Sequence, residues 1–155
     1  MINKIVLIVI SIFIVIFFAG CDSQNENSNN QYQSESKISS DNIAPADKIE
    51  VVHFHGTHQC WSCTTVGKLA LQTIKDKFAE EYKNGIIVFK EINIDLPENS
   101  EIVQKYQVAG SSLFINSIIG NEDNIQEDVD VWRYVSNESQ YTNYFQSNLN
   151  KLLGR

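Results

Sequence analysis

Two cysteines, in the segment Cys60-Trp61-Ser62-Cys63, lie between a strand-like apolar run and a helix-like amphipathic one. The run Ile49–Phe54 is rich in β-branched and aromatic residues, which predicts a buried strand. After the cysteines, apolar residues recur at three- and four-residue spacing as far as Tyr82, which predicts a helix that Asn84-Gly85 ends. The cysteines are therefore expected at the start of a helix that follows a strand.

The rest of the chain continues the alternation of strands and helices. Residues 86–94 predict a second strand, and because a helix separates it from the first, the two are expected to be parallel. Pro97 begins a short helix expected over residues 97–106. A third strand is expected at 113–115, a weak fourth at 128–131, and a closing helix at 137–153. This order predicts an α/β domain.

The position of the two cysteines favours thiol chemistry. The positive end of a helix stabilises a thiolate, so Cys60 is expected to be an exposed nucleophile that attacks a disulfide. Cys63, one turn later and more buried, could then resolve the mixed disulfide. Trp61 between them is interpreted either as an aromatic rim that docks a partner protein or as a cover for the disulfide.

The first twenty residues have the character of a targeting segment. Lys4 precedes an apolar run, Ile5–Phe18, that is shorter than the roughly 20 residues of a spanning helix and ends in small residues. Residues 1–20 are therefore predicted to be a signal peptide, with an uncleaved anchor as the alternative. The segment Phe18-Ala19-Gly20-Cys21 resembles a bacterial lipobox, except that leucine is usual in place of Phe18. The resemblance implies lipidation of Cys21 and membrane anchoring outside the cytoplasm.

Residues 21–47 contain almost no large apolar side chains, so they are predicted to be a disordered tether that holds a domain over residues 48–155 off the membrane. With Cys21 assigned to lipid, Cys60 and Cys63 are each other's only intramolecular partners in an oxidising compartment. The 155 residues carry a net charge of -7, with 12 Lys and Arg against 19 Asp and Glu, which argues against nucleic acid as a partner.

From Lys48 onward, the order of elements and the Cys-Trp-Ser-Cys motif resemble the thioredoxin superfamily. The resemblance implies a thioredoxin-like fold, with a central mixed four-stranded sheet flanked by helices. It also implies exchange with the dithiol or disulfide of a partner protein, without a cofactor. Segments 54–63, 93–99 and 106–108 are similar to small lipoproteins known as nitrophenyl compound nitroreductase subunits, which are found near arsenic-resistance genes.

Two positions depart from ordinary thioredoxins. Where those proteins have a cis-proline before the third strand, the aligned residue is Ser112, and the only prolines are Pro45 and Pro97. A cis Ser111–Ser112 bond would cost about 2.5 to 4 kcal/mol, so a trans bond is expected. The buried carboxylate that thioredoxins carry six residues before the first cysteine is matched by Phe54, so proton transfer needs another group.

All three histidines, His53, His55 and His58, lie within seven residues of Cys60. His58 is the preferred candidate for tuning or shuttling protons at the dithiol, His55 is the next, and His53 is interpreted as a core or edge residue. The predicted catalytic residues are thus Cys60, Cys63 and His58.

Two alternatives remain open. Imidazole and thiolate ligands suit Zn²⁺ or Cu⁺, and a dithiol can chelate trivalent arsenic, so a set drawn from Cys60, Cys63, His58 and His55 could bind and pass on a metal or metalloid ion. No second cysteine pair completes a tetrahedral set, which counts against this reading. A structural disulfide on an inactive fold is the third possibility.

Overall fold

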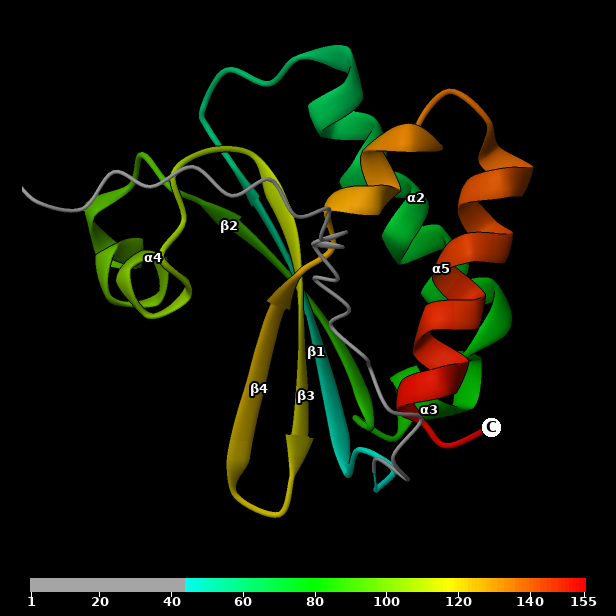
Figure 1. Ribbon diagram of the computed structural model, residues 1–155. Helices are drawn as coiled ribbons and strands as arrows, with labels where there is room; N and C mark the ends of the chain where they lie inside the picture. Colours follow the sequence, from blue (N-terminus) through cyan, green and yellow to red (C-terminus); the bar gives the residue numbers. More distant parts are fainter. Residues whose placement is uncertain (1–43) are drawn as a thin grey trace, which may run out of the picture. The chain divides into compact units, whose positions relative to one another are not determined.

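The computed structural model describes residues 44–155, which form an α/β arrangement around one four-stranded sheet (Figure 1). The strands are β1 (Lys48–His55), β2 (Ile87–Asn93), β3 (Ser112–Ile119) and β4 (Glu122–Glu127). Their order in the sheet is β2-β1-β3-β4, with β1 parallel to β2 and antiparallel to β3, and β3 antiparallel to β4. The predicted thioredoxin-like fold, with a mixed four-stranded sheet flanked by helices, is confirmed.

Helices cover both faces of this sheet (Figure 1). They are α2 (Trp61–Lys77), α3 (Ala79–Lys83), the short 3-10 helix η2 (Pro97–Asn99), α4 (Ser100–Tyr106), the 3-10 helix η3 (Val129–Arg133) and α5 (Glu138–Leu152). The sheet's larger core cluster includes buried residues of α2 and α5, and the smaller one includes Tyr106 of α4.

The alternation of side chains along β1 separates the two cores. Ile49 and Val51 belong to the cluster on the α2 side, whereas Val52 and Phe54 belong to the cluster on the α4 side. Because successive strand residues point to opposite faces, His53 and His55 continue the row that faces α2. This alternation decides which side chains of β1 lie beneath the cysteines.

The helix expected to reach Tyr82 is interrupted. Phe78 adopts φ -134° and ψ 37° between α2 and α3, although its amide still donates to the Ile74 carbonyl at 2.9 Å. The Phe78 side chain is almost completely buried, as it would be in a continuous helix. The spacing of apolar residues therefore does not reveal the interruption. Gly85, with φ 74°, follows α3 in the left-handed conformation that favours glycine, as the expected helix stop requires.

The prediction of a fourth strand at 128–131 is wrong. The strand lies at 122–127, and η3 occupies 129–133. Gly120, with φ 62°, and Asn121 form a two-residue turn that joins β3 to β4 as a hairpin. β4 is an edge strand whose side chains are mostly exposed, and Ile125 is its only apolar residue. The hydropathy of β4 therefore does not resemble that of a buried strand.

The last residues of the predicted tether pack against the domain. The Ala46 amide donates to the Leu152 carbonyl and the Asp47 amide to the Ile118 carbonyl, each at 2.9 Å. The Asp47 carboxylate accepts from the Gly120 amide at 2.6 Å. The predicted signal peptide, Cys21 and the tether as far as residue 43 lie outside the described residues, so these assignments stay predictions.

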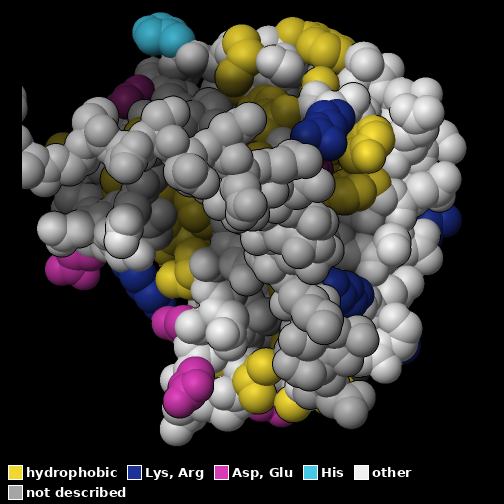
Figure 2. Space-filling model, viewed as in Figure 1, with side chains coloured by type: hydrophobic (Ala, Val, Ile, Leu, Met, Phe, Trp, Pro, Cys, Tyr) yellow, Lys and Arg dark blue, Asp and Glu magenta, His cyan; other side chains and the backbone are white. Residues whose placement is uncertain are grey.

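None of the helices within residues 44–155 is long and apolar enough to cross a bilayer. On the face drawn in Figure 2, Lys and Arg side chains lie at separate points and do not form one basic patch.

Candidate functional site

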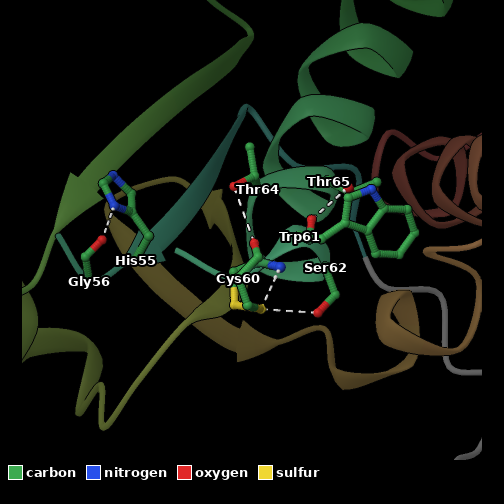
Figure 3. Close-up of a disulfide and its surroundings, with 8 residues drawn as sticks. His55, Gly56, Cys60, Trp61, Ser62, Thr64 and Thr65 are labelled. Carbon is green, nitrogen blue, oxygen red and sulfur yellow. Dashed lines mark hydrogen bonds between the residues drawn. A yellow bond between two sulfur atoms is a disulfide. The ribbon is translucent and has the colours of Figure 1, made fainter. Parts of the chain in front are cut away.

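The two cysteines form a disulfide at the first turn of α2 (Figure 3). Cys60 is the N-cap of this helix, with φ -76° and ψ 166°, and its Cα lies 5.1 Å from that of Cys63. The Cys63 amide donates to the Cys60 sulfur at 3.1 Å, and the Thr64 amide donates to the Cys60 carbonyl at 3.1 Å. The Cys60 side chain therefore takes the place of the serine or aspartate that usually caps a helix.

The surroundings of the Cys60 sulfur favour negative charge. The Ser62 hydroxyl lies 3.1 Å from this sulfur and is the donor, because a disulfide sulfur has no proton. No acidic residue occupies the first turn of α2, and the partial positive charge of the helix end adds to the two donors. After reduction, the same groups would stabilise a thiolate at Cys60.

The two sulfurs differ in their access to solvent. Cys60 is exposed, whereas Cys63 is half-buried. The Trp61 side chain is 67% exposed, and in Figure 3 its indole points away from the disulfide. A partner's sulfur can therefore reach Cys60 from solvent, and Trp61 leaves the disulfide uncovered.

The loop before Cys60 is fixed by residues that follow β2. The Asp95 carboxylate accepts from the Thr57 amide at 2.7 Å, and the Asn93 side-chain amide donates to the Thr57 hydroxyl at 3.2 Å. The Asn93 side-chain oxygen in turn accepts from the Asp95 amide at 3.0 Å. The Thr57 amide holds the pKa of Asp95 below its usual value. These contacts connect the end of β2 to the approach to Cys60.

The three histidines occupy different environments. His53 is fully buried, and its ring centroid lies 5.5 Å from that of His55, which is on the same face of β1. The Nδ1 nitrogen of His55 is the donor in a 2.9 Å hydrogen bond to the Gly56 carbonyl. His58 is exposed in the loop, and no hydrogen bond of its side chain is found among the described residues. The structure thus brings His53 and His55 together.

His53 is packed against α2 in a space that only glycine leaves free. A Cβ atom at Gly67 would overlap the His53 ring, which also lies beside the Cys63 backbone. Neither ring nitrogen has a hydrogen-bond partner among the described residues, although Glu91 Oε1 lies 3.5 Å from Nδ1. Burial lowers the pKa of His53, and the Glu91 carboxylate opposes that shift only in part.

Phe54, the residue matched to the buried carboxylate of thioredoxins, lies on the face of the sheet opposite to that of His53. Phe54 points to the α4 side of the sheet and packs edge-on against Phe114, with ring centroids 5.6 Å apart. The titratable residue beneath α2 is His53, seven residues before Cys60. Counting six residues back reaches a side chain on the opposite face, because neighbouring strand residues alternate.

Ser112, at the position of the thioredoxin cis-proline, begins β3 beside Phe54 in the register of the sheet. Its peptide bond with Ser111 is trans, as expected, and its hydroxyl donates to the Gly110 carbonyl at 3.1 Å. Within residues 44–155, no three His, Cys, Asp or Glu side chains gather in a way that could hold a metal ion. The alternative ligand set of Cys60, Cys63, His58 and His55 stays a prediction.

Sequence reasoning missed Glu91, Asp95 and Gly67. Glu91 interrupts the apolar run of β2, but only the pairing of β2 with β1 places it opposite His53. Asp95 lies in segment 93–99, which resembles the small lipoproteins, but that resemblance implies no structural role for this residue. A glycine inside a predicted helix is a signal of close packing, and Gly67 could have been found in that way.

Comparisons with known proteins found similar chains only among solved structures. No family model and no curated protein matches the chain. Among solved structures, the zinc-bound form of human ERp44 has a TM-score of 0.47 at 19% identity. The match covers 67% of this chain and 27% of ERp44, so the chain spans about a quarter of that protein.

Two thioredoxins are also similar. A thioredoxin from Thermus thermophilus has a TM-score of 0.45 at 15% identity, over 68% of this chain and 76% of that one. The Malassezia sympodialis thioredoxin Mala s 13 has a TM-score of 0.37 at 18% identity, over 63% of this chain and 78% of that one. Likenesses at this level carry no information on activity, so a function has to be inferred from the site itself.

Proposed function

We propose that the protein is a membrane-anchored, extracytoplasmic thiol-disulfide oxidoreductase that exchanges electrons with partner proteins through Cys60 and Cys63. The observation that carries this proposal is the disulfide at the N-terminus of α2, where the exposed Cys60 sulfur accepts hydrogen bonds from the Cys63 amide and the Ser62 hydroxyl. A bridge with only structural importance would need neither exposure nor donors at one sulfur.

The reaction proceeds in two exchanges. In the reduced form, the Cys60 thiolate attacks a partner's disulfide, a bond forms between the two sulfurs, and the partner's second sulfur leaves as a thiolate. Cys63 then loses its proton and attacks Cys60, which restores the internal disulfide and releases the partner as a dithiol. In the opposite direction, a partner dithiol is oxidised and Cys60 and Cys63 are reduced. His58, exposed in the loop before Cys60, supplies a proton donor or acceptor within the same segment.

The chain's N-terminal features support the location. The apolar run Ile5–Phe18 and the lipobox-like residues ending at Cys21 favour export and lipidation. Expression in a bacterium, followed by mass spectrometry of the membrane fraction, tests this part of the proposal. The expected result is a chain that begins at an acylated Cys21, while Cys21→Ser leaves the chain without acyl groups. An unacylated native chain would contradict the lipid anchor.

Catalysis is tested by the reduction of insulin with dithiothreitol, which is followed as turbidity. The full chain is expected to shorten the lag before precipitation, and Cys60→Ser is expected to abolish the effect. Cys63→Ser should form a stable mixed disulfide with insulin, because the resolving thiol is missing. Equal lag times with the native chain and with Cys60→Ser would refute the oxidoreductase. Protection of the reduced sulfurs by Zn²⁺, Cu⁺ or arsenite in that case would favour a binding protein.

A further inference from the structure

A cavity of about 320 Å³ lies between the β3–β4 hairpin and α5. Ile115 and Ile119 of β3 and Leu152 of α5 supply apolar surface to its wall. The volume falls within the range of about 300 to 1,000 Å³ that small-molecule sites occupy in proteins. Neither Cys60 nor Cys63 lines the cavity, so it is not part of the dithiol site.

Asp128, on the wall of this cavity, is a buried carboxylate that is only 7% exposed. Its Oδ1 atom accepts from the Tyr144 hydroxyl at 2.6 Å, and its Oδ2 atom accepts from the Asn148 side-chain amide at 2.9 Å. Both of these partners also line the cavity, and both are neutral donors. Burial raises the pKa of Asp128, and the hydrogen bonds oppose this shift only in part.

The charge of Asp128 has no cationic partner within residues 44–155. Buried carboxylates in proteins are normally paired with a cation, but none of the ion pairs among these residues includes Asp128. Asp130, which also lines the cavity, is paired with Arg133 at 3.2 Å. Lys151 is the one basic side chain on the wall, and no hydrogen bond or ion pair joins it to Asp128. A cation inside the cavity would supply the missing charge.

Apolar surface lies beside this carboxylate. Val129, the next residue along the chain, lines the cavity and is 59% exposed, which makes it one of three exposed large apolar side chains within residues 44–155. Ile119 and Leu152 on the same wall are half-buried. A bare ion would leave this surface in contact with water, whereas a hydrocarbon chain would cover it. The wall therefore suits a ligand with a positive group and a short apolar part.

We propose that this cavity binds an aliphatic primary amine, whose ammonium group pairs with Asp128 while its hydrocarbon chain packs against Val129, Ile119 and Leu152. The inference goes beyond the proposed function, because the cavity and the dithiol share no residue. An ammonium group is preferred over a metal ion, since no three His, Cys, Asp or Glu side chains within residues 44–155 gather in a way that could hold one. Hydrogen bonds between an ammonium group and a carboxylate are roughly twice as strong as neutral ones.

The test is isothermal titration calorimetry of the full chain at pH 7.5, with pentylammonium chloride as the probe. We expect pentylammonium to bind at least tenfold more tightly than 1-pentanol, which has the same chain without the charge. It should also bind at least tenfold more tightly than ammonium chloride, which lacks the chain. Equal binding of pentylammonium and either control would overturn the proposal.

An aliphatic ammonium group is carried by free amines and by lysine side chains, so a capped Ala-Lys-Ala peptide forms a second arm. Tighter binding of pentylammonium than of the peptide would identify the ligand as a free amine. Tighter binding of the peptide would place the ammonium group on a protein partner. Either result supports an ammonium site at Asp128.

Substitutions assign the site to Asp128. Asp128→Asn keeps the shape of the side chain but removes its charge, and should weaken the binding of pentylammonium at least tenfold. Val129→Asn should weaken it by a smaller factor, because only apolar contact is lost. Lys151→Gln removes the like charge on the wall and should leave binding equally tight or tighter. Glu101→Gln, which removes an exposed carboxylate on α4 outside the cavity, should leave it within twofold.

Equal affinity of the native chain and a folded Asp128→Asn variant would overturn the proposal, as would the absence of binding to the native chain. Neither result affects the oxidoreductase, which the insulin assay tests separately. If Asp128→Asn does not fold, nuclear magnetic resonance of the native chain decides the question. Pentylammonium should shift the methyl signals of Ile119 and Leu152 at concentrations at which 1-pentanol does not, and unchanged signals would refute the site.

Discussion

The sulfur of Cys60 has two donors beside it, the Cys63 amide and the Ser62 hydroxyl, each at 3.1 Å. Thr64, in the same turn, uses its hydroxyl differently, since that group donates to the Cys60 carbonyl at 3.2 Å. Neighbouring hydroxyls at the start of α2 thus have separate partners, one at the sulfur and one at the backbone. This difference offers a matched pair of substitutions.

Ser62→Ala should slow the alkylation of reduced Cys60 by iodoacetamide at pH 7 about three- to tenfold. A hydrogen bond typically contributes about 0.5 to 1.5 kcal/mol, and about 1.4 kcal/mol corresponds to a tenfold change. Thr64→Ala removes the hydroxyl that bonds to the backbone and should leave the rate within twofold. The measurement is the alkylation rate against pH. Equal slowing by both substitutions would show that the Ser62 hydroxyl has no special effect on the sulfur.

His53 makes the stability of the fold depend on pH. Burial lowers its pKa in the folded state below the ordinary histidine value of 6.5, so the unfolded chain binds this proton more readily. The contribution is fully present above pH 6.5 and is lost as the pH falls from 6.5 through the lower pKa of the folded state. The melting temperature should therefore decrease between pH 7.5 and 5. His53→Gln should flatten this decrease, and an unchanged slope would contradict the assignment.

Among the helices and strands, those whose positions depend on the spacing of apolar residues can be predicted from the sequence. The strands β1 and β2, the helix α5 and the βαβ connection follow from runs of Val, Ile, Leu and aromatic residues that bury one face or both. The strand β4 does not follow, because a single apolar residue, Ile125, is consistent with an exposed edge or with a loop. The Gly120-Asn121 turn was the available signal for the hairpin.

Some parts of the candidate site can likewise be predicted from the sequence and others cannot. The positions of the two cysteines can be predicted, because a helix start and a Cys-x-x-Cys spacing are both local features. The pairing of His53 with Glu91 is not local, since the register between β1 and β2 decides it. Which histidine lies beneath α2 also depends on the strand alternation, and His53 and Phe54 are adjacent in the sequence. Contacts between elements are thus the part that the sequence alone leaves undetermined.

The contact of α5 with α2 gives a prediction at this scale. The Tyr141 hydroxyl is buried and donates to the Val66 carbonyl at 3.0 Å. Tyr141→Phe should lower the free energy of unfolding by about 1 kcal/mol, because one buried hydrogen bond is lost while the ring remains. Tyr134→Phe is the control, since its hydroxyl makes no hydrogen bond within the described part of the chain. Urea unfolding measures both, and equal losses would contradict the role of the Tyr141 hydroxyl.

At the scale of the whole domain, the disulfide contributes little to holding the fold together. It joins residues three positions apart within one helical turn, whereas the cores lie on the two faces of the sheet. In the chain-entropy model, closing a loop of about four residues stabilises a protein by roughly 2 kcal/mol, compared with about 4.7 kcal/mol for 100 residues. The domain can therefore be expected to keep its fold while the dithiol cycles between its two states.

An oxidoreductase that works through Cys60 and Cys63 requires the bond between them to open and close reversibly. Equilibration of the full chain in glutathione buffers without metal, with thiol trapping to count free sulfurs, measures its reduction potential directly. A reversible transition between about -120 and -270 mV, the span of known exchange catalysts, is the predicted result. A disulfide that stays closed below about -300 mV would contradict the oxidoreductase function, because it would behave as a structural bridge.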